Sequence, residues 1–154
     1  MTWTDCMLRI LLSIILGFFI GLERQMTGHG AGIRINILLA MGSCLFLMFP
    51  IISGSNEVYR IASSIVSGVG FLCSGVIFKG DGMVRGLHTA ATLWCTAAIG
   101  VMVSFGNCLF AAAATGILIL SNLLSRFESK AGNWMAGNRA SISHFRYLPG
   151  NLGK

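Results

Sequence analysis

Residues 68–95, GVGFLCSGVIFKGDGMVRGLHTAATLWC, decide the class of this protein. Two apolar runs rich in small residues flank a short turn, and the formal charges of the stretch, Lys79, Asp81 and Arg85, all lie in that turn. Charges confined to a connection between two uncharged lengths are typical of two membrane-spanning segments whose turn lies in water. The bilayer is therefore the expected solvent of this chain.

The composition agrees with this interpretation. Of 154 residues, 55% are hydrophobic and 10% are charged, and the mean hydropathy is +0.77. A soluble domain of this size would have more apolar surface than one core could bury. Five runs without Asp, Glu, Lys or Arg approach the ~20 residues of a helical span: 10–22, 35–52, 61–78, 87–105 and 108–124. We predict an all-α integral membrane protein, a bundle of five transmembrane helices.

The first run and the long uncharged length 86–125 differ from the length of a single span. The first run reaches spanning length only if it begins near Cys6 and Arg9 extends to the interface. A cleaved signal peptide over residues 7–22 is the alternative, but Glu23 and Arg24 follow where a small-x-small cleavage site would be needed. The uncharged length 86–125 must fold back on itself, and its polar cluster at residues 104–107 predicts the turn.

Basic residues predict the orientation. With five spans, Arg9 and Arg60 lie on one side, and the other nine basic residues lie opposite. The positive-inside rule then places the C-terminus in the cytoplasm and the N-terminus outside. The net charge of +6 is accounted for by this bias and by anionic lipid, so we expect no nucleic-acid partner.

The chain is expected to have one folded part and a tail. Residues 1–125 form the transmembrane bundle, and residues 126–154 form a short basic cytoplasmic tail whose glycines and asparagines interrupt any long helix. We favour a flexible, solvated tail. The alternative is a short interfacial helix over residues 126–135, anchored by Phe127 and Trp134.

Chemistry-bearing residues are scattered. The five cysteines show no C-x-x-C spacing and the three histidines lie in separate regions, so we expect no metal site and no cofactor. The five acids lie at or beyond span ends, which makes a single copy a poor carrier of Mg²⁺. No nucleophile has a base and an orienting acid nearby, so we expect no enzyme.

Small residues recur at four-residue spacing, which lets membrane helices approach closely. The pairs include Gly17 with Gly21, and Ser64 with Gly68. We favour internal packing of one bundle over a dedicated dimer face, and a homo-oligomer stays open as the alternative.

Polar groups gather at the predicted cytoplasmic edge. They are Glu23, Arg24, Arg34, Lys79, Asp81 and Arg85, with His88 at a span boundary. Ion pairs such as Glu23 with Arg34 are expected, and the excess positive charge suits lipid phosphates or an acidic partner. A role in topology alone is the equal alternative. For His88, marking the interface is favoured over proton handling.

An ordered series of motifs resembles the MgtC/SapB family over about residues 10–120. The motifs are GLERQ at 21–25, AGIR at 31–34, RIA at 60–62, IVSGVGFL at 65–72, GVIFK at 75–79, VRGL at 84–87, TAATLWC at 89–95 and AAIG at 97–100. The resemblance implies a multi-pass protein of the bacterial inner membrane with five spans. It also implies a role in adaptation to low Mg²⁺, acid or phosphate stress and in virulence.

Family motif positions are carried over residue by residue. They are Glu23, Arg24, Gly32, Arg34, Arg60, Gly68, Gly70, Gly75, Lys79, Arg85, Gly86, Thr89 and Trp94. The chain departs from the family at Ile35, at Cys73 with Ser74, and at His88, where Thr or Asn is usual in a position linked to partner contact. Longer members add a cytoplasmic ACT-type domain after the bundle, so we expect no regulation through such a domain here.

These observations lead to one expected function and two alternatives. We expect a non-enzymatic regulator that binds other membrane transport proteins, of the ATP synthase or P-type Mg²⁺ ATPase class, as the resemblance implies. The charged edge and His88 are the expected contact residues with partner or lipid. Helix packing is expected at Gly17, Gly21, Gly68, Gly70, Gly75, Thr89 and Trp94. The alternatives are an oligomeric Mg²⁺ or proton transporter and a lipid-binding scaffold.

Overall fold

The protein is described here from a computed structural model that covers residues 2–28, 30–80 and 83–124. The chain divides into two compact units, Met1–Ile119 and Leu120–Lys154. In the second unit the described residues are 120–124, which are helical. The predicted tail 126–154 lies outside the described residues, so its flexibility stays a prediction.

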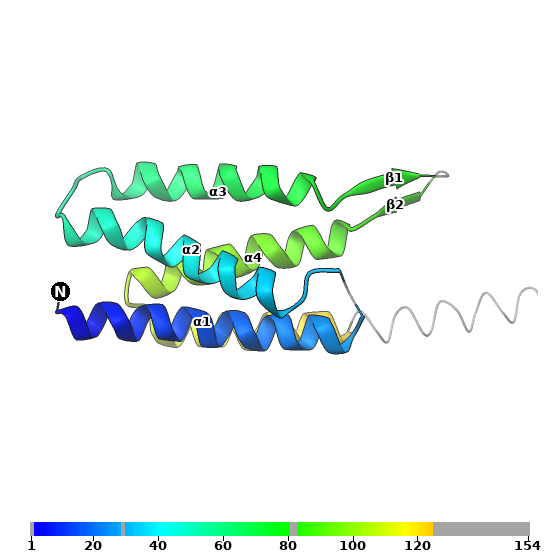
Figure 1. Cartoon of the computed structure of the whole chain (residues 1–154), viewed down its shortest axis with the longest axis horizontal. Coiled ribbons are helices and arrows are strands. Elements are labelled where there is room, and N and C mark those ends of the chain that lie inside the picture. The colour runs from blue at the N-terminus through cyan, green and yellow to red at the C-terminus, as the bar shows by residue number, and fades with distance from the viewer. Residues whose placement is uncertain (1, 29, 81–82, 125–154) are drawn as a thin grey trace, which may run out of the picture. The chain divides into compact units, whose positions relative to one another are not determined.

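The described part of the chain contains five helices and one small hairpin. The helices are α1 (Trp3–Met26), α2 (Ile33–Ile52), α3 (Val58–Ser74), α4 (Leu87–Ser104) and a further helix, Cys108–Leu124. Strands β1 (Phe78–Gly80) and β2 (Met83–Arg85) pair antiparallel, with Phe78 opposite Arg85. Helices α1 to α4 alternate in direction, so the hairpin and the α1–α2 connection share one end of the first unit (Figure 1). We call this the hairpin end.

Three helices have spanning length. α1, α2 and α4 are long and apolar enough to cross a membrane, whereas α3 and Cys108–Leu124 are apolar but shorter. At 1.5 Å per residue a 17-residue helix such as α3 is about 25 Å long, against ~30 Å of hydrocarbon. The described chain is thus helical apart from its small hairpin, with three candidate membrane spans, and the five-span count stays a prediction.

The helix ends have local causes. Thr2 caps α1, because its hydroxyl accepts from the Asp5 amide while the Asp5 carboxylate accepts from the Thr2 amide. α4 ends at Ser104, at the predicted turn. We expected a short charged turn before α4 and no strands, whereas the flanks of this turn form β1 and β2. Gly86 joins β2 to α4 with φ +89°, and a Cβ there would lie 1.9 Å from the Val76 carbonyl oxygen, so glycine is required.

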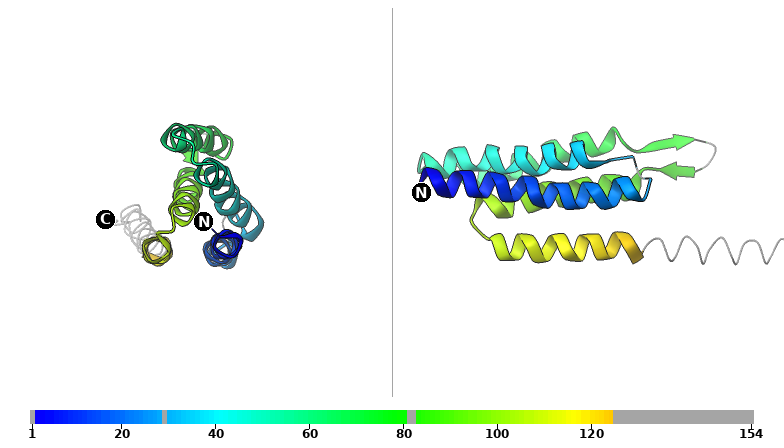
Figure 2. Two further views of the ribbon diagram at one scale, coloured as in Figure 1. Left: turned by 90° about the vertical axis from the view of Figure 1, so that its left-hand side faces the viewer. Right: turned by 60° about the horizontal axis from the view of Figure 1, so that its bottom comes forward.

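Glycines set the distance between the central helices. A Cβ on Gly21 would lie 2.5 Å from the Ile33 Cα, and one on Gly17 would lie 2.8 Å from the Asn36 carbonyl oxygen, so α1 contacts the α2 backbone directly. Gly100 does the same for α4, where a Cβ would lie 2.2 Å from the Ala40 carbonyl oxygen. α2 and α4 accordingly lie between α1 and α3 (Figure 2).

α3 is attached to the rest of the unit along a narrow strip. Its buried residues are Val69 and Cys73, which pack with Ala90, Leu93 and Ala97 of α4. Its small residues do not take part: a Cβ on Gly68 or Gly70 would meet nothing within 4 Å. The internal packing that we expected of the small-residue pairs therefore describes α1, but not these two positions of α3.

Candidate functional site

Arg24 is the largest fully buried side chain in the described part of the chain. It lies in the last turn of α1 and reaches the first turn of α4. Its Nη1 lies 2.9 Å from Nδ1 of His88, and its Nη2 donates to Oγ1 of Thr89 over 2.6 Å. Its Nε is buried and has no hydrogen-bond partner among the described residues. The sequence places Arg24 at a helix end, but only the packing shows that it is enclosed.

The chemistry of these partners makes the site unusual. A guanidinium can only donate, so Nδ1 of His88 must accept and the ring proton must be on Nε2. Both acceptors are therefore neutral, and the preceding residue Glu23 contributes electrostatic attraction. A buried cation with neutral acceptors and one unpaired nitrogen is costly in free energy. Costly charges of this kind in membrane proteins mark functional sites.

The Arg24–His88 bond predicts different outcomes for two His88 substitutions. We expect His88→Leu to lower the free energy of unfolding by about 1–3 kcal/mol. Nη1 of Arg24 would lose its acceptor, in addition to Nε, which has none in the original chain. His88→Asn should behave like the original chain, because its amide oxygen can take the place of Nδ1. Thermal unfolding in detergent, followed by circular dichroism, measures both. Equal unfolding temperatures for all three chains would show that the bond contributes no stability.

A second buried polar side chain, Asn36, connects α2 to α4 in the middle of the unit. Asn36 of α2 is fully buried, and its amide nitrogen donates to the carbonyl oxygens of Ala31 and Gly32 over 3.0 and 2.9 Å. Its Oδ1 accepts from the Thr96 hydroxyl of α4 over 3.1 Å. Thr92 lies one turn before Thr96 and donates to the His88 carbonyl oxygen. Hydroxyls on one face of α4 thus link the surroundings of Arg24 to Asn36.

At the opposite end of the unit, Arg9 is held by the end of α4. Its Nη1 donates to the Ser104 carbonyl oxygen over 2.5 Å. Our sequence interpretation singled out neither this bond nor the pairing of Asn36 with Thr96. The available signal was the presence of Asn36 and Thr96 inside runs that carry no charge and are mostly apolar. Polar residues there face a bundle interior more often than lipid.

The other predicted contact residues lie at the hairpin end. Arg34, Lys79, Arg85 and His88 are exposed, and Glu23 is half-buried. Asp81 lies outside the described residues. Of the predicted packing residues, Thr89 binds Arg24, Gly75 is exposed, and Trp94 is 48% exposed on α4.

Three of the cysteines, Cys6, Cys44 and Cys73, are buried and act as small core side chains, whereas Cys95 and Cys108 are half-buried. Sγ of Cys73 donates to the Ala90 carbonyl oxygen over 3.2 Å and so ties α3 to α4, and Sγ of Cys44 contacts Sδ of Met48. Within the described residues, no three His, Cys, Asp or Glu side chains gather as a metal site would require.

Comparison with known proteins places the chain in a family. The MgtC family model matches residues 10–130. Protein MgtC of Brucella abortus (strain 2308) is 48% identical over 115 residues, which are 74% of this chain and 48% of that protein. Protein MgtC of Salmonella typhimurium (strain LT2) is 45% identical over 119 residues, 77% of this chain and 52% of that protein.

The chain spans about half the length of these curated relatives. No solved structure matches it. Arg24, its two partners His88 and Thr89, and the motifs at residues 21–34 and 84–95 all lie inside the matched region. Because the family model covers most of the chain and the relatives share nearly half of the aligned residues, the chain belongs to the MgtC family.

Proposed function

We propose that this chain is a non-enzymatic regulator in the bacterial inner membrane that acts by binding other membrane transport proteins. The hairpin end carries the proposal. Arg34, Lys79 and Arg85 are exposed there, and the fully buried Arg24 lies behind the exposed His88. The excess of positive charge favours an acidic surface or a lipid phosphate as the contact.

The topology is part of the same proposal. We propose five spans, with the hairpin end in the cytoplasm and the N-terminus outside. The basic residues of the hairpin end support this orientation, because Arg9 and Arg60 are the basic residues of the opposite end in the described chain. α3 can cross if flanking residues extend to the interfaces or the bilayer thins locally.

The physiological role rests on family membership. A role in adaptation to low Mg²⁺, acid or intracellular stress, and partners of the ATP synthase or P-type Mg²⁺ ATPase class, are what the family resemblance implies. A regulator of this kind needs an exposed, oriented contact surface, which the hairpin end offers.

Site-specific photocrosslinking tests the proposal directly. A photoreactive amino acid replaces Arg34 or Arg85 in the full chain, expressed in its host under Mg²⁺ starvation. The expected products are adducts with integral membrane transport proteins, identified by mass spectrometry. The matched control carries the same group at Arg60, an exposed position of the opposite end. Equal adduct yields from the two ends would overturn the proposal.

An oligomeric Mg²⁺ or proton transporter is the second candidate. The observation in its favour is the set of buried hydroxyl and amide groups from Thr92 to Asn36, which could carry a polar path if several copies assembled. Purified protein in liposomes loaded with a Mg²⁺ or pH indicator separates the two candidates. Ion flux that Glu23→Gln abolishes would establish transport and contradict the regulator proposal.

A further inference from the structure

A groove separates α2 from α3. It has a volume of about 480 Å³, and apolar side chains line it together with Gly42, Ser43, Ser64 and Gly68. Toward the end of α2 it continues into a second apolar depression beside Phe46, Phe49 and Ile61. A Cβ on Gly42 or Gly68 would meet nothing within 4 Å, so both walls leave room for a further element.

Ser43 provides an independent indication that the groove has an occupant. It is only 3% exposed and lines the groove, yet no hydrogen bond involves its hydroxyl among the described residues. The other buried hydroxyls of the unit bond to a carbonyl of their own helix, as Ser13 does to Ile10 over 2.7 Å. An unpaired hydroxyl at membrane depth is costly, so the occupant should offer a hydrogen-bonding group. A hydrocarbon chain offers none.

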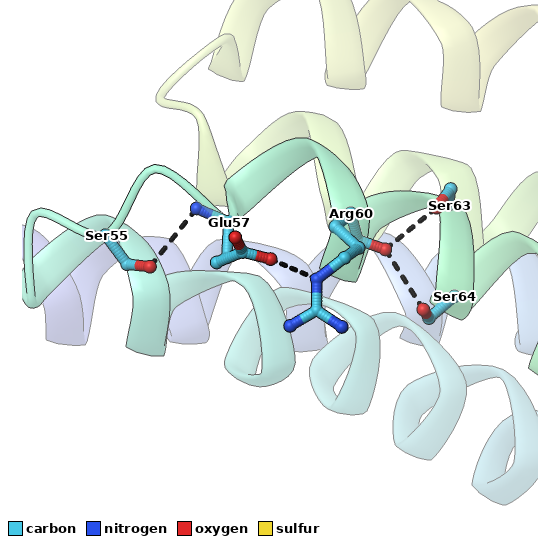
Figure 3. A network of polar contacts seen from close by, with 5 residues as sticks. All are labelled: Ser55, Glu57, Arg60, Ser63 and Ser64. Atoms are coloured by element: carbon cyan, nitrogen blue, oxygen red, sulfur yellow. Dashed lines mark hydrogen bonds and ion pairs between the residues drawn. The ribbon is translucent and has the colours of Figure 1, made fainter.

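The exposed side of α3 carries small and polar residues of the kind that could fill this groove and bond to Ser43. Ser64 and Gly68 lie on its groove side, and Ser67 and Phe71 lie next to them around the helix. The hydroxyls of Ser63 and Ser64 both donate to the Arg60 carbonyl oxygen, as Figure 3 shows. In contrast, the exposed Ser67 hydroxyl has no hydrogen bond among the described residues. Small and polar residues on a membrane helix face another helix more often than lipid.

The two serines without partners also lie at the same depth. Ser43 lies nine residues before the end of α2 at Ile52, and Ser67 lies nine residues after the start of α3 at Val58. α2 and α3 run antiparallel and are joined by a short connection. Each hydroxyl therefore lies roughly 13 Å from the same end of the unit. Ser43 opens into the groove, while Ser67 lies on an exposed face, so the two cannot be satisfied by one copy in this arrangement.

We propose that this chain forms a two-fold dimer in which α3 of each copy lies in the α2–α3 groove of the other. Both copies have the same orientation in the membrane, so the axis is along the bilayer normal and the two α3 helices contact each other through the same face. That face is Ser64 with Gly68. Ser67 and Phe71 then contact α2 of the second copy, and the Ser43 hydroxyl bonds to Ser67 of the second copy.

The charges near the interface are compatible with parallel α3 helices. Glu57 and Arg60, at the start of α3, form an ion pair within one copy. A two-fold axis would bring Glu57 and Arg60 of both copies to the same level. Each copy pairs these two charges internally, so repulsion between the copies is small (Figure 3). The dimer uses none of the hairpin-end contact residues, so it is independent of the proposed partner surface.

Counting subunits tests the dimer. The full chain carrying a fluorescent label is reconstituted in liposomes at low density, and photobleaching steps are counted. We expect two steps for the original chain, and dimerisation weaker by roughly tenfold or more for Gly68→Leu, whose side chain fills the groove. Gly116→Leu is the matched control, because Gly116 is also an open helical position but lies outside the groove. Thermal unfolding of each variant verifies that it folds.

A disulfide test checks the register. Ser43→Cys with Ser67→Cys should give a dimer crosslinked under mild oxidation, whereas Ser43→Cys with Ser63→Cys should not. The native thiols are buried or half-buried, and the original chain supplies their background. Single-step bleaching of the original chain would overturn the proposal. So would unchanged dimerisation of Gly68→Leu, or a phospholipid retained in the groove of a monomer by native mass spectrometry.

Discussion

Gly100→Ala is expected to lower the free energy of unfolding by about 1–3 kcal/mol or more, the cost typical of overpacking. The added methyl group would lie 2.2 Å from the Ala40 carbonyl oxygen and 3.0 Å from its carbon. Both are backbone atoms, so relief requires α2 and α4 to move apart. Such a movement would also lengthen the hydrogen bond between Thr96 and Asn36, which lies one turn away.

The matched control for Gly100→Ala is Gly116→Ala. A Cβ on Gly116 meets nothing within 4 Å, so the change should be neutral or slightly stabilising, because alanine has the higher helix propensity. Thermal unfolding in detergent, followed by circular dichroism, measures both variants. An unchanged unfolding temperature for Gly100→Ala would show that α2 and α4 are not in backbone contact.

Arg24→Met is expected to leave the bundle folded but to abolish crosslinking of the hairpin end to its partner. Replacing a buried charge by an apolar side chain of similar length is often neutral or stabilising, because the desolvation cost disappears. Here the Arg24 guanidinium also has an unpaired Nε, which strengthens the expectation. His88 is exposed and can bond to water once its donor is gone. If Arg24 holds His88 in position for partner contact, Arg24→Met should abolish the partner contact without lowering the stability of the bundle.

Two readouts separate a functional from a structural role of Arg24. The unfolding temperature should stay equal to or above that of the original chain, while the adduct yield from position 85 should fall to the background of the opposite end. Arg24→Lys should lose most of the adducts as well, because an ammonium group does not present the planar fork of donors that reaches both His88 and Thr89. Arg60→Met, which removes an exposed ion pair, is the control for loss of charge. Unfolding of Arg24→Met would make Arg24 a structural residue, and retained adducts would exclude it from the contact.

The site was only partly visible in the sequence. Arg24, Arg34, Lys79, Arg85 and His88 could be assigned to one end of the bundle, because charge in a membrane protein is confined to aqueous edges. The bond from Arg24 to His88 could not be predicted, since it joins residues 64 positions apart. The β1–β2 hairpin was missed, although Asp81-Gly82 between short apolar stretches is a signal for a hairpin turn.

By itself, the sequence determined the apolar helical class of the chain, the turn after α4 and the end at which the basic residues gather, but not the end of α3, which stops at Ser74 before the missed hairpin. These are local properties, because a bilayer requires apolar lengths and excludes charge wherever the chain lies within it. Only the tertiary structure decided which small residues touch a neighbour. Gly17 with Gly21 and Ser64 with Gly68 have the same spacing, yet the first pair contacts the α2 backbone and Gly68 borders an open groove. The rotation of each helix about its axis makes that difference, and it is set by the packing of all helices together.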